Sequence, residues 1–192
     1  METVVKQIDG EEVKDGMFYN EKIKKIALTA MFLSLGFLLP FLTGQIKEIG
    51  DTLLPMHIPI MLCGLICGYK YGFVAGAVLP FLRGIIAGMP PLYPNAVWMA
   101  AELCVYGGVV GFLYMKFFRK QMWWLYCCLL ISMISGRIVW GVTKAVLLGV
   151  AGKAFTLQAF LAGGFIDSLP GIVLQLILIP VIMQIINKNY KP

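Results

Sequence analysis

Ionisable side chains occur inside segments of this sequence that are otherwise apolar. A charged Arg, Lys or Asp at membrane depth costs roughly 2.5–3.5 kcal/mol on insertion scales, so such a residue usually marks a binding site or a transport pathway. Five successive apolar segments contain at least one ionisable residue, and together they hold His57, Arg83, Glu102, Arg137, Lys144 and Asp167. This recurrence favours one shared polar pocket over a series of unrelated exceptions.

The apolar segments have the length and composition of transmembrane helices. Of the 192 residues 59% are apolar and the mean hydropathy is +0.83, whereas a soluble domain is about half apolar. Because a bilayer core of ~30 Å takes about 20 apolar residues per helix, the sequence predicts an all-α integral membrane protein. Its six predicted transmembrane helices are 23–44, 53–68, 73–89, 96–117, 122–150 and 157–186, with a tight turn at 69–72 and a proline-broken loop at 90–95.

The distribution of Lys and Arg predicts the orientation of these helices. An even number of helices places both termini on one side of the membrane, and the opposite side then carries only Lys47 and Lys153. Because cytoplasmic loops are enriched in Lys and Arg, both termini are predicted to be cytoplasmic. The chain divides into a polar, loosely ordered cytoplasmic tail at 1–21, a six-helix membrane domain at 22–187 and a cytoplasmic tail at 188–192. The net charge of +6 therefore reflects topology, and no nucleic-acid partner is expected.

In this orientation the ionisable residues lie in the outer part of the membrane and toward its middle, where they could surround one solute. Trp140 is one turn from both Arg137 and Lys144 and shares their helix face, so it is the preferred stacking residue. His57 is expected to bond to a neighbouring helix rather than to a ligand. Apolar and aromatic walls with a few convergent polar groups are typical of small-molecule sites. The predicted solute-binding residues are Arg83, Asn95, Trp98, Glu102, Arg137, Trp140, Lys144 and Asp167.

A purely structural role for the same charges is the alternative. Arg83 could pair with Glu102, and Arg137 with Asp167, and each pair would then hold two helices together. The cations Arg83, Arg137 and Lys144 outnumber the two carboxylates, however, so one positive charge stays unmatched. An anionic or strongly polar solute would account for this surplus.

Small residues form two further patterns. Glycines recur along the second, third and fourth predicted helices, where they permit close packing within the chain, at Gly64, Gly68, Gly72, Gly76, Gly107, Gly108 and Gly111. Ala27, Ala30 and Ser34 form a stripe near the cytoplasmic end of the first helix, which either packs internally or docks another membrane protein. The cysteines lie in apolar spans and are interpreted as small packing residues, and they lack partners at metal-ligand spacing. No Walker, GxSxG or HExxH motif occurs, so neither an enzyme nor a bound cofactor is expected.

Five short motifs, in this order, resemble those of one transporter family. They are Met56-His57-Ile58-Pro59, Cys67-Gly68-Tyr69-Lys70-Tyr71-Gly72, Gly88-Met89-Pro90-Pro91-Leu92-Tyr93-Pro94, Gly136-Arg137-Ile138-Val139-Trp140-Gly141 and Ser168-Leu169-Pro170-Gly171. With the six-helix layout over 22–187, the chain resembles the substrate-binding S component of energy-coupling factor (ECF) vitamin transporters of bacteria and archaea. The resemblance implies a multi-pass protein of the cell membrane that binds a vitamin or related micronutrient near the outer face.

The resemblance also implies partners and a mechanism. An S component joins a transmembrane coupling protein and two ATPase subunits, and it carries its solute inward by toppling in the membrane. The family docks through an Ala-x-x-x-Ala motif in the first helix. The matching residues here read Ala27-x-x-x-Met31 or Ala30-x-x-x-Ser34, so Ala27, Ala30 and Ser34 are the predicted docking residues.

The solute and one other function class stay open. The pattern is most similar to S components assigned to pantothenate, an acid that a surplus positive charge would suit, while related members handle queuosine precursors or cobalamin. A stand-alone secondary carrier or a small-solute channel is the alternative. A carrier would transport alone on an ion gradient, whereas an S component would bind alone but need ATP and its partners to accumulate solute.

The predicted orientation can be tested by labelling introduced cysteines in intact cells with a membrane-impermeant thiol reagent. Lys47→Cys or Lys153→Cys should react and Lys120→Cys should not, because only the first two positions are predicted to face outward. The unmodified chain is the control, since its own cysteines lie in apolar spans. Labelling of Lys120→Cys from outside would reverse the orientation and place the pocket on the cytoplasmic side.

Overall fold

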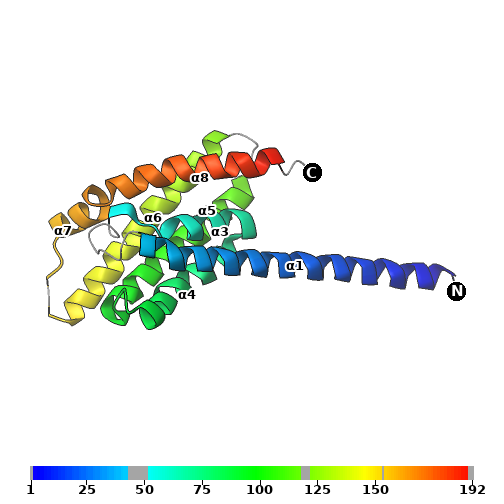
Figure 1. The fold of residues 1–192 in the computed structure, drawn as a ribbon, viewed down its shortest axis with the longest axis horizontal. Helices are drawn as coiled ribbons and strands as arrows, with labels where there is room; N and C mark the ends of the chain where they lie inside the picture. The colour runs from blue at the N-terminus through cyan, green and yellow to red at the C-terminus, as the bar shows by residue number, and fades with distance from the viewer. Residues whose placement is uncertain (1, 43–51, 118–121, 153, 190–192) are drawn as a thin grey trace.

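The computed structural model describes residues 2–42, 52–117, 122–152 and 154–189. The regular elements in these ranges are helices (Figure 1), and no β-strand occurs among them, so the predicted all-α class is confirmed for this part of the chain. In chain order the elements are α1 (Glu2–Leu42), α3 (His57–Cys67), α4 (Tyr69–Ala87), η1 (Leu92–Ala96), α5 (Val97–Phe117), α6 (Met122–Val150), α7 (Leu157–Leu161), η2 (Ala162–Ile166) and α8 (Leu169–Asn189).

Most of the helical segments are long enough to cross a membrane. Five candidate spans are Asn20–Phe41, Tyr69–Ala87, Leu92–Phe117, Met122–Val150 and Leu157–Ile186. Helix α3, the remaining predicted span, has 11 residues. At 1.5 Å per residue it extends about 16 Å, against a bilayer core of ~30 Å. The chain is therefore a multi-pass membrane protein in which α3 is a shorter apolar helix than the other five spans.

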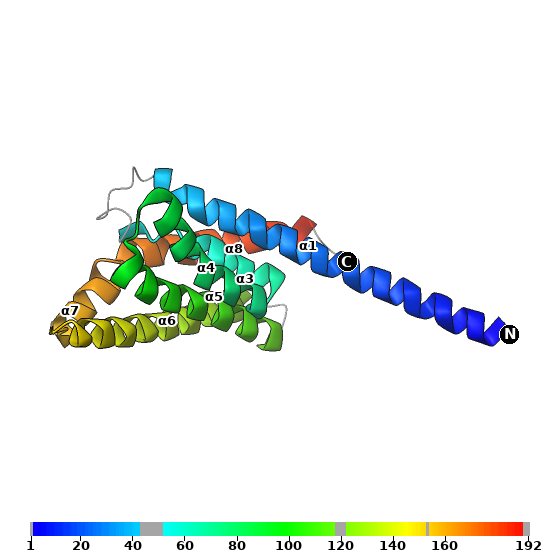
Figure 2. The same ribbon diagram turned by 90° about the horizontal axis from the view of Figure 1, so that it is seen from below.

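The helices form a bundle with both chain ends toward one end of it and α7 at the other (Figure 1). In the turned view α1 runs along one side and α6 along the opposite side, and α3, α4 and α5 lie between them (Figure 2). A chain that crosses the membrane an even number of times has both termini at the same end of its bundle. Which side of the membrane the termini face stays a prediction.

Helix α3 lies at the centre of this bundle. Every residue of α3 except Ile66 is buried, and the helix contacts α1, α4, α5 and α8. A helix that is apolar on all sides is expected in such a position, where neighbouring helices rather than lipid cover it. Pro59 is tolerated because it lies in the first turn, where its missing N–H removes no bond within the helix.

The chain reverses direction between α3 and α4 at a single residue. Gly68 has φ 104° and ψ 165°, a conformation that is essentially restricted to glycine. Because this residue alone makes the reversal, α4 begins at Tyr69, and the prediction of a tight turn at 69–72 is wrong. Part of the predicted loop at 90–95 also has regular structure, because the π-type turn η1 begins at Leu92. Tyr93 within this turn keeps an extended backbone.

Four glycines bring α3, α4 and α5 into backbone contact. A Cβ built on Gly72 would lie 2.6 Å from the carbonyl oxygen of Gly107 and 2.6 Å from the Cα of Gly64. A Cβ on Gly76 would likewise meet the backbone of Leu103. The predicted use of glycine for close internal packing is confirmed at these positions, and this packing holds α5 against the two preceding helices.

The last predicted span is interrupted. Helix α7 and the π-type turn η2 precede a break at Asp167 and Ser168, and α8 begins at Leu169. The Ser168 hydroxyl donates to the carbonyl of Gly163 at 2.9 Å and closes this break. Pro170 fits beyond it because the first turn of a helix accepts proline.

The amino-terminal segment is helical, whereas the sequence predicts a loosely ordered tail at 1–21. Helix α1 begins at Glu2, and Pro40 is the proline inside it. The early segment is rich in Glu and Lys, which are good helix formers. Polar composition therefore does not by itself indicate an irregular backbone in this segment.

Enlarging Gly107 should destabilise the bundle. The Cβ of Gly107→Ala would meet the backbone of Gly72, and overpacking of this kind costs about 1–3 kcal/mol. Gly149→Ala is the matched control, because nothing lies within 4 Å of a Cβ at that position in α6. Thermal unfolding of the purified protein in detergent should show a lower midpoint for Gly107→Ala only. Equal midpoints for the two variants would contradict the backbone contact.

Candidate solute-binding site

A cavity of about 510 Å³ lies where α3, α4, η1, α5, α6 and the break before α8 converge. Its volume falls within the range of roughly 300–1,000 Å³ typical of small-molecule pockets. The structure brings all the predicted solute-binding residues to its walls, namely Arg83, Asn95, Trp98, Glu102, Arg137, Trp140, Lys144 and Asp167. Their role in binding stays a prediction, but their convergence on one space is a property of the fold.

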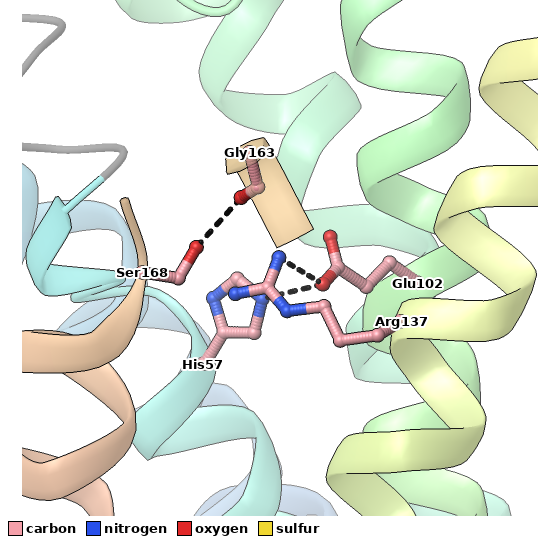
Figure 3. A network of polar contacts seen from close by, with 5 residues as sticks. All are labelled: His57, Glu102, Arg137, Gly163 and Ser168. Atoms are coloured by element: carbon pink, nitrogen blue, oxygen red, sulfur yellow. Dashed lines mark hydrogen bonds and ion pairs between the residues drawn. The ribbon is translucent and has the colours of Figure 1, made fainter. Parts of the chain in front are cut away.

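A buried carboxylate joins three helices at this cavity (Figure 3). Oε1 of Glu102 in α5 lies 3.0 Å from Nη1 of Arg137 in α6 and 3.5 Å from Nε2 of His57 in α3. Glu102 is only 2% exposed. The His57 ring also lies edge-on to Tyr106, with 4.9 Å between ring centroids. His57 therefore contacts a neighbouring helix, as expected.

Neither ion pair of the purely structural alternative is present among the described residues. Glu102 pairs with Arg137 rather than with Arg83, and Asp167 forms no ion pair with Arg137 in the described part of the chain. The reason is helix packing: α5 and α6 approach closely at Gly136, where a Cβ would lie 2.6 Å from the Tyr106 ring. Asp167 instead lies exposed in the break before α8.

Several buried polar atoms around this network have no hydrogen-bond partner among the described residues. They are Nδ1 and Nε2 of His57, Arg83 Nε, Glu102 Oε1, and Nε and Nη2 of Arg137, and the Glu102 contacts are therefore ion pairs by distance. Leaving such an atom unsatisfied costs about 1–3 kcal/mol, so native structures contain few of them. Both arginines line the cavity, and their unused N–H groups suit a solute that offers oxygen acceptors.

Arg83 occupies a different environment from Arg137. It is 5% exposed, and its Nη1 lies 3.9 Å from the thioether sulfur of Met56. Its guanidinium lies 5.5 Å from the centroid of the Phe41 ring. A thioether is a weak acceptor, and among the residues that the structure describes Arg83 forms no ion pair with a carboxylate.

Aromatic rings surround the third cation of the cavity. Nζ of Lys144 lies 4.5 Å from the centroid of a Trp140 ring, 5.4 Å from Trp98 and 5.3 Å from Phe155. The Arg137 guanidinium lies 6.0 Å from Trp140, so the predicted shared face of Trp140, Arg137 and Lys144 is confirmed. Cation–π attraction at these distances stabilises both cations against the rings.

Sequence reasoning missed several residues that shape the cavity. Met56, Met99, Gly163 and Ser168 line it, and Phe155 packs against Trp140. Met56 and Ser168 belong to motifs that the sequence analysis singled out, and Met99 follows Trp98 directly. Phe155 carried no signal, because it lies in an irregular segment whose position only the folded chain defines.

The predicted docking stripe lies on the outer face of α1. Ala27, Ala30 and Ser34 are exposed, while Phe32 and Gly36 on the opposite face are buried against the bundle. The Ser34 hydroxyl donates to the carbonyl of Ala30 at 2.9 Å, so it is satisfied within its own helix. The alternative of internal packing is therefore wrong for this stripe.

Removing one partner of the buried ion pair should destabilise the protein more than removing both charges. Arg137→Gln alone leaves the Glu102 carboxylate buried and uncompensated, a change that costs about 3–5 kcal/mol in buried pairs. Glu102→Gln combined with Arg137→Gln should recover part of this loss, because no buried charge is left. Thermal unfolding without added solute measures both variants. Losses that simply add would show that the two side chains are not coupled.

Comparison with known proteins agrees with the architecture of the chain. The family model of the ECF transporter, substrate-specific component, matches residues 24–183. No curated protein is similar enough to the chain to count as a match. The matched range extends from α1 into α8 and contains every cavity residue named above. The chain therefore belongs to the substrate-specific components, or S components, of ECF transporters.

Proposed function

We propose that this S component is the high-affinity solute-binding subunit of an ATP-driven importer in the cell membrane, and that its cavity binds a vitamin or related micronutrient. The observation that carries the proposal is the convergence of polar and aromatic side chains from several helices on one cavity of about 510 Å³. Charged groups inside an apolar bundle are costly, and a solute site accounts for their being gathered in one place.

The arrangement of the charges favours binding by a preformed site. Glu102 is held between Arg137 and His57, so these side chains need little reordering when a solute enters. Preorganisation of this kind raises affinity because less conformational freedom is lost on binding. The unused N–H groups of Arg137 would bond to solute oxygens, and Trp98 and Trp140 would cover its apolar part.

Pantothenate is the best candidate solute. It combines a carboxylate with neutral hydroxyl and amide groups, which suits a cavity whose cations outnumber its carboxylates. A cavity of about 510 Å³ fits a molecule of this size better than one as large as cobalamin. A queuosine precursor stays the second candidate.

The outer face of α1 is the proposed docking surface for the transmembrane coupling protein. Small residues there would let a partner helix approach closely, and two ATPase subunits on that partner would supply the energy. The alternative, a self-sufficient secondary carrier, would leave the exposed Ala27, Ala30 and Ser34 stripe without a role.

Purification and transport assays test the proposal directly. The purified protein should retain a small solute that mass spectrometry can identify, and it should bind pantothenate without partners. In liposomes it should accumulate the solute only with the coupling protein, both ATPases and ATP. Uptake by the chain alone, driven by an ion gradient, would instead establish a secondary carrier.

Enlarging the docking stripe should separate transport from binding. Ala30→Leu combined with Ser34→Leu should abolish ATP-dependent uptake, because bulkier side chains hold the partner helix away. Solute affinity of the isolated protein should stay unchanged, since neither residue lines the cavity. Leu35→Phe, an enlargement at an exposed position beside the stripe, is the control. Uptake that survives the double substitution would remove this face from the docking surface.

A further inference from the structure

We propose that Arg83 is the anion-binding residue of the cavity, and that the solute carries a carboxylate which pairs with this guanidinium. The inference rests on the proposed function of the cavity as a solute site, and it deepens that function by naming the charge of the solute and the residue that recognises it. It also assigns different tasks to the two arginines that line the cavity.

The environment of Arg83 gives the first reason. The side chain is 95% buried, being 5% exposed, and its Nε has no hydrogen-bond partner among the described residues. Its Nη1 lies 3.9 Å from the Met56 sulfur, and its guanidinium lies 5.5 Å from the centroid of the Phe41 ring. Neither contact carries a negative charge that could compensate the guanidinium.

The state of the other cations gives the second reason. Arg137 lies 3.0 Å from the Glu102 carboxylate, so an incoming anion at Arg137 would compete with a charge that is already in place. Lys144 is enclosed by the rings of Trp98, Trp140 and Phe155. Arg83 is the cavity arginine without a carboxylate partner in the described part of the chain, and it therefore has most to gain from a solute anion.

The geometry of the groups suits a carboxylate. A guanidinium presents N–H donors in a planar fork that matches two carboxylate oxygens, and such charge-assisted bonds are among the strongest in proteins. Nε of Arg83 has no partner among the described residues, and with the adjacent Nη2 it forms the edge of the guanidinium that such a fork uses. Arg137 also has two nitrogens without a partner, Nε and Nη2, but its positive charge is already neutralised by Glu102. These two N–H groups therefore suit neutral oxygens such as hydroxyls and amide carbonyls.

The test compares an acid with its uncharged counterpart on two arginine variants. The probes are pantothenate and pantothenol. Pantothenate carries a carboxylate at one end, where pantothenol carries a neutral alcohol. The wild-type protein should bind pantothenate at least tenfold more tightly. Arg83→Gln should lower pantothenate affinity about tenfold to a hundredfold, the range for a bond to a charged group, and should leave pantothenol affinity nearly unchanged.

Matched variants separate this role from simple damage to the fold. Arg83→Lys should keep part of the preference for the acid, because it keeps the charge but loses the fork. Arg137→Gln should weaken both probes to a similar degree. Lys70→Gln, which removes an exposed cation outside the cavity, should affect neither probe. Thermal unfolding of each variant shows whether it is folded when binding is measured.

The outcomes distinguish failure of the inference from failure of the proposed function. A preference for the acid that persists in Arg83→Gln would overturn the assignment while leaving the cavity as the solute site. A neutral or cationic solute found by mass spectrometry would overturn the inference in the same way. If the purified protein retains a different carboxylic acid, that acid and its uncharged amide replace pantothenate and pantothenol as the probes. Absence of any solute binding would overturn the proposed function, and the inference with it.

Discussion

The structure depends on one carboxylate in an apolar bundle. Glu102 lies between Arg137 and His57, and it thereby joins α5 to α6 and α3 at the level of the cavity. A buried charge must be compensated, since its desolvation otherwise costs several kcal/mol. The glycine contacts between α3, α4 and α5 bring the helices close enough for that compensation to occur. Backbone packing and charge pairing therefore support each other, and the cavity forms where they meet.

The three cations that line the cavity have different electrostatic environments. Glu102 neutralises Arg137, and aromatic rings surround Lys144. These two cations are stabilised whether or not a solute is present. Arg83 lies beside the Met56 sulfur and the Phe41 ring, and it forms no ion pair with a carboxylate among the described residues. A site built in this way is held in shape by its own contacts and keeps one charge for recognition, which is how a binding subunit can be both preformed and selective.

Helix α1 connects the two surfaces that the proposed function requires. Pro40 near its end lines the cavity, and Ser34 and Ala27 lie on its outer face. At 1.5 Å per residue these positions are about 9 Å and 20 Å from Pro40 along the helix. The solute site and the docking stripe are thus separate in space but share one helix. In the proposed importer, a partner that moves α1 would also move one wall of the cavity.

The sequence alone determined the class of the protein and the charged and aromatic residues that line its cavity, because hydropathy and the position of charges within apolar segments are read directly from residue types. The family model agrees with the resemblance that the short motifs carry. Sequence could not determine which charges pair, since Glu102 is matched to Arg137 by the packing of α5 on α6 rather than by proximity along the chain. Nor could it show that Gly68 reverses the chain alone, that α8 begins after a break, or that Phe155 reaches Trp140. Those features depend on contacts between distant segments, and only the tertiary structure brings such segments together.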